Sequence, residues 1–254
     1  MVSGTFNRIE HVILVGVGGG VPNINNESRH VRLGDIVVSH PVQADDIAYI
    51  HCKDITTDED GLPMFVTKTW RPEDKQLNDV ITQIQNDYKK NAFFGDSWQE
   101  YIREAESELQ GGDMRFTRPA PDSDKLYRIH DNTETSMEHP KSPSDSVRAR
   151  FPDQPVLHAG PVGTGKPLVK DDKTREEFAA RHGVLCVDSG FQAVLDSIDG
   201  NRKESFALIR GVSDYEDGAQ RREWQPYASL VAAAFMKSVL MRVPWPHDSD
   251  SDDD

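Results

Sequence analysis

Short apolar runs alternate with amphipathic stretches along this chain, and the alternation predicts an α/β protein. Apolar runs rich in β-branched residues and bounded by glycine or polar residues are typical of buried strands. They occur at 11–17, 155–162, 184–187 and 206–212. Two further regions are less regular. The run 31–39 predicts two short strand pieces around Gly34-Asp35, and 47–54 with 64–69 predicts a hairpin.

Apolar positions at helical spacing predict the helices. They fall at 74–90, 96–109, 171–182 and 191–198, and a final helix is expected to open at Pro226 and run to about residue 240. Asp171 is a predicted N-cap and Gly183 the matching helix stop. Strands that alternate with helices favour an α/β sandwich with a largely parallel sheet.

The segment 113–154 departs from this pattern, because proline, serine and charged residues dominate it. A loop of this length inside a compact domain is a lid, an insertion or a disordered stretch. We interpret it as an insertion over or beside a site, within one domain spanning 1–246. The acidic end, 247–254 (HDSDSDDD), has nothing to bury and is predicted to be a disordered tail.

Composition narrows the functional classes. The 254 residues carry a formal net charge of -14 and show no basic cluster, so nucleic acid is not an expected partner. No run approaches the roughly 18–20 apolar residues of a membrane helix, and no leader peptide pattern opens the chain. Two distant cysteines, Cys52 and Cys186, indicate no disulfide framework. A cytoplasmic protein is therefore expected.

Carboxylates follow two of the predicted strands. Asp214 comes directly after the strand 206–212 and Ser213, and a loop and a helix follow it. Open α/β sheets bind ligands at such strand ends, so Asp214 is a candidate site residue. Asp188 ends the strand 184–187 in the same way. A helix N-cap is an equally good interpretation of Asp188.

Two glycine-rich segments have weaker meanings. Gly160 to Lys166 (GPVGTGK) has the spacing of a phosphate-binding loop, but Pro167 stands where a hydroxyl should bind magnesium. A strand end that lines a pocket fits it better. Gly16 to Gly20 (GVGGG) lacks the dinucleotide spacing. It indicates either close approach of a ligand or a tight turn. The histidines have no metal-ligand spacing, and no G-x-S-x-G elbow is present, so neither a metal nor a serine nucleophile is expected.

Taken in order, five segments resemble the purine and uridine phosphorylase superfamily. They are VILVGVGGGVP, VRLGDIVVSHP, GPVGTGKPLVKDDKTREEFA, GVLCVDSGF and ALIRGVSDYEDGAQRREWQPYASLVAAAFMKSVL. The sequence is most similar to the nucleoside-phosphorylase-like domains of eukaryotic multidomain proteins, over roughly 9–243. The resemblance implies a three-layer α/β sandwich around a central mixed sheet. Its implied chemistry is cleavage of the N-glycosidic bond of a nucleoside, by phosphate or by water.

The resemblance also implies roles for individual residues. The family's Ser-Asp motif falls on Ser213 and Asp214. Its glycines, which line the ribose and anion pocket, fall on Gly18, Gly19 and Gly20. The Glu-Met-Glu segment that cradles base and ribose falls on Asp188, Ser189 and Gly190. No cofactor is implied beyond phosphate as a co-substrate, and since family members form dimers, trimers or hexamers, a homo-oligomer is allowed.

Two departures bear on activity. Gly190 replaces the glutamate that binds the ribose hydroxyls, which should weaken ribose binding by about 1.5–3 kcal/mol per charged hydrogen bond. Family members also carry several strands before the one that opens this sequence, including a loop that helps to hold phosphate, and we expect those N-terminal strands to be missing. The missing phosphate loop favours water over phosphate as the nucleophile. Both departures favour a catalytically impaired module, whereas the intact RGVSDY block favours an active enzyme.

Two functions therefore stand. The first is cleavage of a purine nucleoside or nucleotide by water or phosphate, in which Asp214 is the acid to the leaving base. The second is a catalytically impaired module that binds nucleosides or serves as a scaffold.

Overall fold

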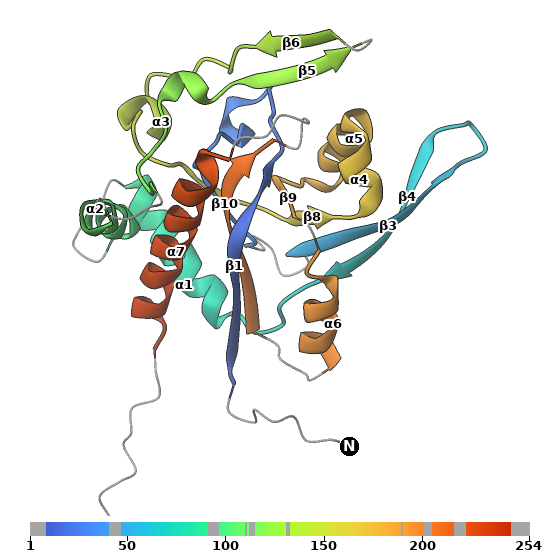
Figure 1. The fold of residues 1–254 in the computed structure, drawn as a ribbon. Helices are drawn as coiled ribbons and strands as arrows, with labels where there is room; N and C mark the ends of the chain where they lie inside the picture. Colours follow the sequence, from blue (N-terminus) through green and yellow to red (C-terminus); the bar gives the residue numbers. More distant parts are fainter. Residues whose placement is uncertain are drawn as a thin grey trace, which may run out of the picture.

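The computed structural model describes residues 9–40, 47–90, 97–109, 111, 115–130, 133–188, 190–200, 205–215 and 222–244. An eight-stranded sheet forms its centre, in the order β4-β3-β8-β9-β1-β10-β2-β7 (Figure 1). The strands are β1 (His11–Gly20), β2 (Ile36–Val38), β3 (Tyr49–Thr57), β4 (Pro63–Trp70), β7 (Leu157–Ala159), β8 (Val162–Thr164), β9 (Cys186–Asp188) and β10 (Ser205–Asp214).

The sheet is mixed. The pairs β1–β10, β2–β7, β3–β8 and β8–β9 are parallel, whereas β1–β9, β10–β2 and β3–β4 are antiparallel. In the central pair, His11 lies opposite Ser205 and the ladder continues to Gly18 opposite Val212. Strand β10 is buried along almost its whole length, as expected of an apolar strand covered on both faces.

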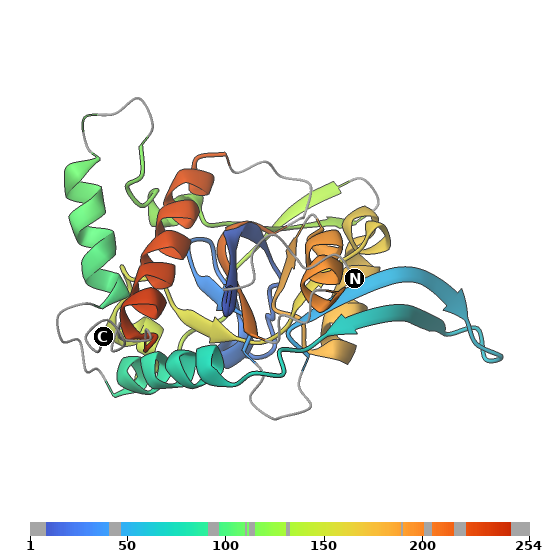
Figure 2. The same cartoon turned by 90° about the horizontal axis from the view of Figure 1, so that it is seen from below.

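Helices cover both faces, so the predicted three-layer α/β sandwich is confirmed (Figures 1 and 2). One layer holds α1 (Gln76–Lys89), α2 (Trp98–Glu108) and α7 (Trp224–Arg242); the other holds α4 (Lys166–Lys170), α5 (Asp172–His182) and α6 (Gln192–Gly200). Within the described ranges, no helix is long and apolar enough to cross a membrane.

Helix α7 lies directly against the backbone of β10 at one point. An ideal Cβ built on Gly211 would be 1.9 Å from the main-chain oxygen of Ala228 and 2.6 Å from its carbonyl carbon. Only glycine permits this approach, because any side chain would occupy the space of the helix backbone. Gly211 therefore sets the distance between α7 and the central strand.

The segment 113–154 contains regular structure where it is described. It forms a hairpin of β5 (Leu126–His130) and β6 (Thr133–Met137), the short helix α3 (Val147–Arg150) and a 3₁₀ turn at Pro121–Ser123. Arg148 anchors it to the sheet, since its Nη2 donates to buried Asp35 at 2.5 Å. His158 Nε2 lies 3.0 Å from the same carboxylate. Burial alone would raise the pKa of Asp35, but the Arg148 charge and the His158 contact outweigh it and lower that pKa.

Several local predictions are confirmed. Strands β3 and β4 form the predicted hairpin, and the helix predicted at 74–90 is α1. Helix α5 has Asp171 as its N-cap and Gly183 at its end, in the left-handed conformation with φ 72°. These elements are specified by neighbours in the sequence, which is why a local pattern finds them.

Three other predictions were wrong in detail. Only Ile36–Val38 of the run 31–39 is a strand, because the chain turns just before it and Asp35 Oδ2 accepts from the Arg32 N–H. The run 155–162 overlaps two strands, β7 and β8, which pair with β2 and β3 respectively. Helix α7 begins at Trp224, two residues before Pro226.

Candidate active site

Asp214 lies at an irregular end of β10. The β1–β10 register shifts there, so that Gly18 is opposite Val212 but Gly19 is opposite Asp214. Ser213 is thus an extra residue, as in a β-bulge. Consecutive side chains of a regular strand point to opposite faces, yet Ser213 Oγ donates to Asp214 Oδ2 at 3.1 Å. The bulge therefore brings both side chains to the same side, and it leaves Asp214 half-buried while Ser213 is buried.

The second predicted carboxylate, Asp188, lies on the other side of the same glycine-rich strand. Strand β9 pairs with the end of β1, with Gly19 opposite Val187, so the β1 glycines lie between the ends of β9 and β10. The structure thus places Gly18, Gly19, Asp188 and Asp214 on three adjacent strands. Ser189, also predicted at this site, lies outside the described residues.

The carboxylate of Asp188 is fully engaged by protein donors. Its Oδ1 accepts from the Tyr49 hydroxyl at 2.8 Å and from the Gly190 N–H at 3.0 Å. Its Oδ2 accepts from Arg210 Nε at 3.1 Å and Nη2 at 2.9 Å. Burial, followed by the Asp188 charge, raises the pKa of Tyr49, so its hydroxyl stays a donor. Asp188 is 4% exposed, and these four contacts give it a structural role; contact of Asp188 with a substrate stays a prediction.

Arg210 is equally committed. Its guanidinium is fully buried, and Nη1 donates to the main-chain oxygens of Leu14 at 2.6 Å and Ile209 at 2.9 Å. The ring of Phe191 covers the guanidinium, with 4.6 Å between the carbon Cζ and the ring centroid. The charge of Arg210 is therefore neutralised by Asp188, and each of its three side-chain nitrogens already donates to a protein oxygen.

We predict that Asp188→Asn lowers the free energy of unfolding by about 3–4 kcal/mol, because it leaves the buried Arg210 charge without its partner. Urea denaturation followed by circular dichroism measures this loss. Asp196→Asn is the matched control, since it breaks the exposed Lys68–Asp196 pair and should change stability little. Equal stability of the two variants would contradict the structural role of Asp188.

The glycines of β1 are required by the packing of protein neighbours. An ideal Cβ on Gly18 would be 2.6 Å from Cys186 Sγ and 3.0 Å from the main-chain oxygen of Val187. One on Gly20 would be 2.7 Å from Val212 Cγ1. Neither glycine has a positive φ. Of the two interpretations left open by the sequence, a tight turn is wrong at these positions, and the close approach observed is by side chains and backbone of β9 and β10.

Gly190 does adopt a conformation that favours glycine, with φ 108°, and an ideal Cβ there would be 2.8 Å from Gln192 Oε1. A glutamate at this position would be strained.

Gly165, within the segment that resembles a phosphate-binding loop, has φ 140° and an ideal Cβ only 2.3 Å from the Cys52 main-chain oxygen. Helix α4 begins at Lys166 and has only five residues. Gly165 is therefore required because the chain at this point packs closely against the backbone of β3.

Sequence reasoning missed Tyr49 and Arg210 as members of the site. Tyr49 is 139 residues from Asp188, so no local pattern connects them. Arg210 did carry a signal, because a single charge inside an apolar strand requires a buried partner. The partner could have been sought among the other strand-end carboxylates.

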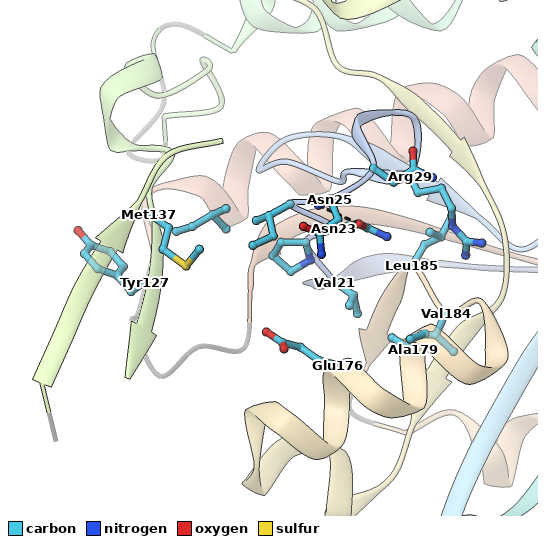
Figure 3. Close-up of a pocket in the computed structure, with 15 residues that line it drawn as sticks. Val21, Asn23, Asn25, Arg29, Tyr127, Met137, Glu176, Ala179, Val184 and Leu185 are labelled. Atoms are coloured by element: carbon cyan, nitrogen blue, oxygen red, sulfur yellow. Dashed lines mark hydrogen bonds between the residues drawn. The ribbon is translucent and has the colours of Figure 1, made fainter. Parts of the chain in front are cut away.

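A cleft of about 540 Å³ lies nearby but does not include these residues. The loop after β1, the β5–β6 hairpin and α5 form its walls, and Glu176 and Met137 face the space between helix and hairpin (Figure 3). It begins at Val21, one residue after the β1 glycines. Neither Asp188 nor Asp214 lines it, so we do not assign it to the same site.

A pair of histidines links the loop after β1 to the 113–154 segment. The Asn23 N–H donates to His30 Nδ1 at 3.1 Å, and His30 Nε2 lies 2.8 Å from His139 Nδ1. His139 Nε2 then lies 2.9 Å from the Asp124 main-chain oxygen. This order requires two neutral rings that each donate through Nε2. Burial lowers the pKa of His30 to about 3, and the positive charges of Arg32 and Arg148 add to the effect.

We predict that acid destabilises the protein through His30. A group whose folded pKa is depressed contributes its full stability above the unfolded value of about 6.5, and loses it as the pH falls toward the folded value. The free energy of unfolding should fall by about 2–3 kcal/mol between pH 7 and 4.5 from this group alone. Urea denaturation across that range gives the slope of the unfolding free energy against pH. In His30→Gln this slope should fall by the equivalent of about one proton. The stability of each variant at pH 7.5 is the reference, and an unchanged slope would contradict the role of His30.

Within the described residues, no group of three or more histidine, cysteine, aspartate or glutamate side chains is placed to hold a metal ion.

Comparison with known proteins supports the fold. No protein-family model matches the sequence. A nucleotide-binding leucine-rich repeat (NLR)-like protein of the fungus Hyaloscypha variabilis is 28% identical over 240 residues, which cover 93% of this chain but only 22% of the relative. The chain therefore spans about a fifth of that relative's length, which fits the multidomain eukaryotic context that the resemblance predicted.

Among solved structures, a putative 5′-methylthioadenosine/S-adenosylhomocysteine nucleosidase from Borrelia burgdorferi, bound to adenine, is similar with a TM-score of 0.51 and 14% identity; the match covers 93% of this chain and 71% of that one. Futalosine hydrolase of Helicobacter pylori gives a TM-score of 0.42 and 13% identity, over 92% and 68% of the two chains. At 14% identity, the likeness to the Borrelia burgdorferi structure establishes the fold alone.

Proposed function

We propose that this protein cleaves the N-glycosidic bond of a purine nucleoside or nucleotide. The observation that carries the proposal is the position of Asp214 on a bulge at the end of β10. There it lies opposite Gly19, and its carboxylate accepts a hydrogen bond from the Ser213 hydroxyl. The likeness of the fold to a putative nucleosidase that was solved with bound adenine supports a purine as the leaving group. The substrate-binding residues proposed with Asp214 are Ser213 and the β1 glycines.

In this mechanism Asp214 is the general acid. Its carboxyl group gives a proton to a ring nitrogen of the base while the bond from C1′ to the base breaks, and the electron pair leaves with the base. The sugar becomes oxocarbenium-like, and the oxygen of a water molecule attacks C1′ and forms the new bond. The proton lost by that water restores Asp214, so the products are free base and sugar. The Ser213 hydroxyl can donate to the ionised carboxylate and accept from the protonated one, which suits both states.

Water is the proposed nucleophile. A phosphate dianion needs cationic or N–H donors that are still available, and Arg210 on this strand is already paired with Asp188 and two main-chain oxygens. Removal of phosphate from the assay should therefore leave turnover unchanged. A strict requirement for phosphate would favour phosphorolysis instead.

Two observations favour the second function, a nucleoside-binding or scaffolding module without turnover. Gly190, with φ 108°, supplies no carboxylate to the ribose hydroxyls, and Asp188 is occupied by Arg210 and Tyr49. A module of this kind would bind nucleosides weakly and release no base.

Incubation of the purified chain with a panel of nucleosides and nucleotides, followed by chromatography for free base, separates the two functions. Release of a purine base supports cleavage. Saturable nucleoside binding in calorimetry without any base release supports the module and overturns the enzymatic proposal.

A further inference from the structure

Tyr215, the residue after Asp214, is held in place by two hydrogen bonds of its hydroxyl group. That hydroxyl donates to Asp124 Oδ1 at 2.5 Å and accepts from the Leu33 N–H at 3.1 Å. The side chain is 2% exposed. Its ring also lies beside the end of β1, since an ideal Cβ on Gly20 would be 3.7 Å from Tyr215 Cδ1. One side chain thus links the exit of β10, the turn before β2 and the glycines of β1.

The 113–154 segment provides the acceptor for Tyr215 and a second contact beside it. Trp224, the first residue of α7, donates through Nε1 to Ser123 Oγ at 3.0 Å. Ser123 and Asp124 are consecutive. The segment therefore holds both Tyr215, directly after β10, and Trp224, where α7 begins.

We propose that Tyr215 and Asp124 form a positioning pair that fixes the orientation of Asp214 for proton transfer. The inference rests on the proposed function. Asp214 lies beyond the register shift of β10, where the ladder to β1 is irregular, so its backbone needs a further restraint. The buried ring and the two hydrogen bonds of Tyr215 provide that restraint one residue later. The 113–154 segment then braces the site from the side of β10, as a fixed part of it.

Tyr215 is a positioning residue and not a catalytic one. Its hydroxyl is used both as donor and as acceptor within the protein, so it has no proton to exchange with a substrate. Burial, and then the charge of Asp124, raises the pKa of Tyr215 well above its ordinary value, which keeps it protonated. Its influence on the reaction must pass through Asp214.

Tyr215→Phe keeps the ring and removes both hydrogen bonds. We expect kcat for base release to fall about 10–100-fold, while KM stays within about threefold, because a displacement near 1 Å is costly in the transition state and less so in binding. Asp124→Leu should reproduce this loss. Asp124→Asn should stay within about threefold of the wild type, because its amide oxygen still accepts from the tyrosine.

Two comparisons separate positioning from a general loss of stability. Tyr88→Phe removes another buried tyrosine hydroxyl, which donates to the Pro155 main-chain oxygen at 3.3 Å, and should destabilise the fold without lowering kcat. In an Asp214→Asn background, Tyr215→Phe should change the residual rate by less than about twofold, because the group that it orients is gone.

The outcomes are distinct. A wild-type kcat in Tyr215→Phe overturns the positioning role. So does a Tyr215→Phe variant whose kcat falls by the same factor in the wild-type and in the Asp214→Asn background. In both cases the cleavage activity itself stands. Failure of the wild-type chain to release base from the whole panel overturns the proposed function and this inference together.

Discussion

Asp214→Asn is expected to lower the rate of base release by about 10²–10⁴-fold while the protein stays folded. Asparagine has nearly the same shape as aspartate, and its amide oxygen still accepts from the Ser213 hydroxyl, so the bulge at the end of β10 should persist. An amide has no carboxylic proton to transfer to the leaving base, however. The rate is measured by chromatography of the free base at saturating nucleoside, and folding by circular dichroism.

Asp199→Asn is the matched control, because it makes the same carboxyl-to-amide change at an exposed position in α6. Its turnover should equal that of the wild type. If Asp214→Asn also turned over at the wild-type rate, Asp214 would have no part in the proton transfer, and the glycosidase proposal would lose the residue that carries it.

Gly211→Ala is expected to reduce the free energy of unfolding by at least about 5 kcal/mol, a large part of the 5–15 kcal/mol typical of a folded domain. The added methyl group would lie 1.9 Å from the Ala228 main-chain oxygen. No rotamer change relieves a clash with helix backbone, so α7 must move away from β10 and lose part of its buried contact with it. Urea denaturation measures the effect, and the soluble yield reports it if the variant does not fold.

Gly16→Ala provides the control on the neighbouring strand. Gly16 lies opposite Arg210 in the same ladder, and an ideal Cβ on it has nothing within 4 Å. Its replacement should leave stability nearly unchanged or raise it by about 0.4–1 kcal/mol through the unfolded chain. A Gly211→Ala variant as stable as Gly16→Ala would show that α7 does not lie against β10 as described.

Local signals in the sequence were sufficient for much of the fold. Helix α5 has its cap and its stop within the sequence that it spans, and the β3–β4 hairpin joins neighbouring runs. The apolar run that became β10 was long enough to be assigned to a buried strand. The resemblance to the phosphorylase superfamily supplied what these signals lack, namely the three-layer arrangement.

Long-range pairing accounts for what the sequence did not predict. The run 155–162 overlaps two strands, because β7 pairs with β2 and β8 pairs with β3. The residues of the run itself do not indicate which strands they will pair with. In the same way, the engagement of Asp188 by Arg210 and Tyr49 depends on three strands that meet only in the folded sheet. Asp214 could be placed at a strand end from sequence, but the bulge that turns it beside Ser213 is a property of the β1–β10 register.

The central ladder also has a consequence for how the molecule is made. His11 and Ser205 are separated by 194 positions, yet they lie opposite each other. During synthesis, the whole stretch between Gly20 and Ser205 must follow β1 before its parallel partner exists. Pairings of such high contact order are slow to form. Until β10 has been made, the β10-facing edge of β1 is unpaired, and an unpaired strand edge favours premature association with other chains.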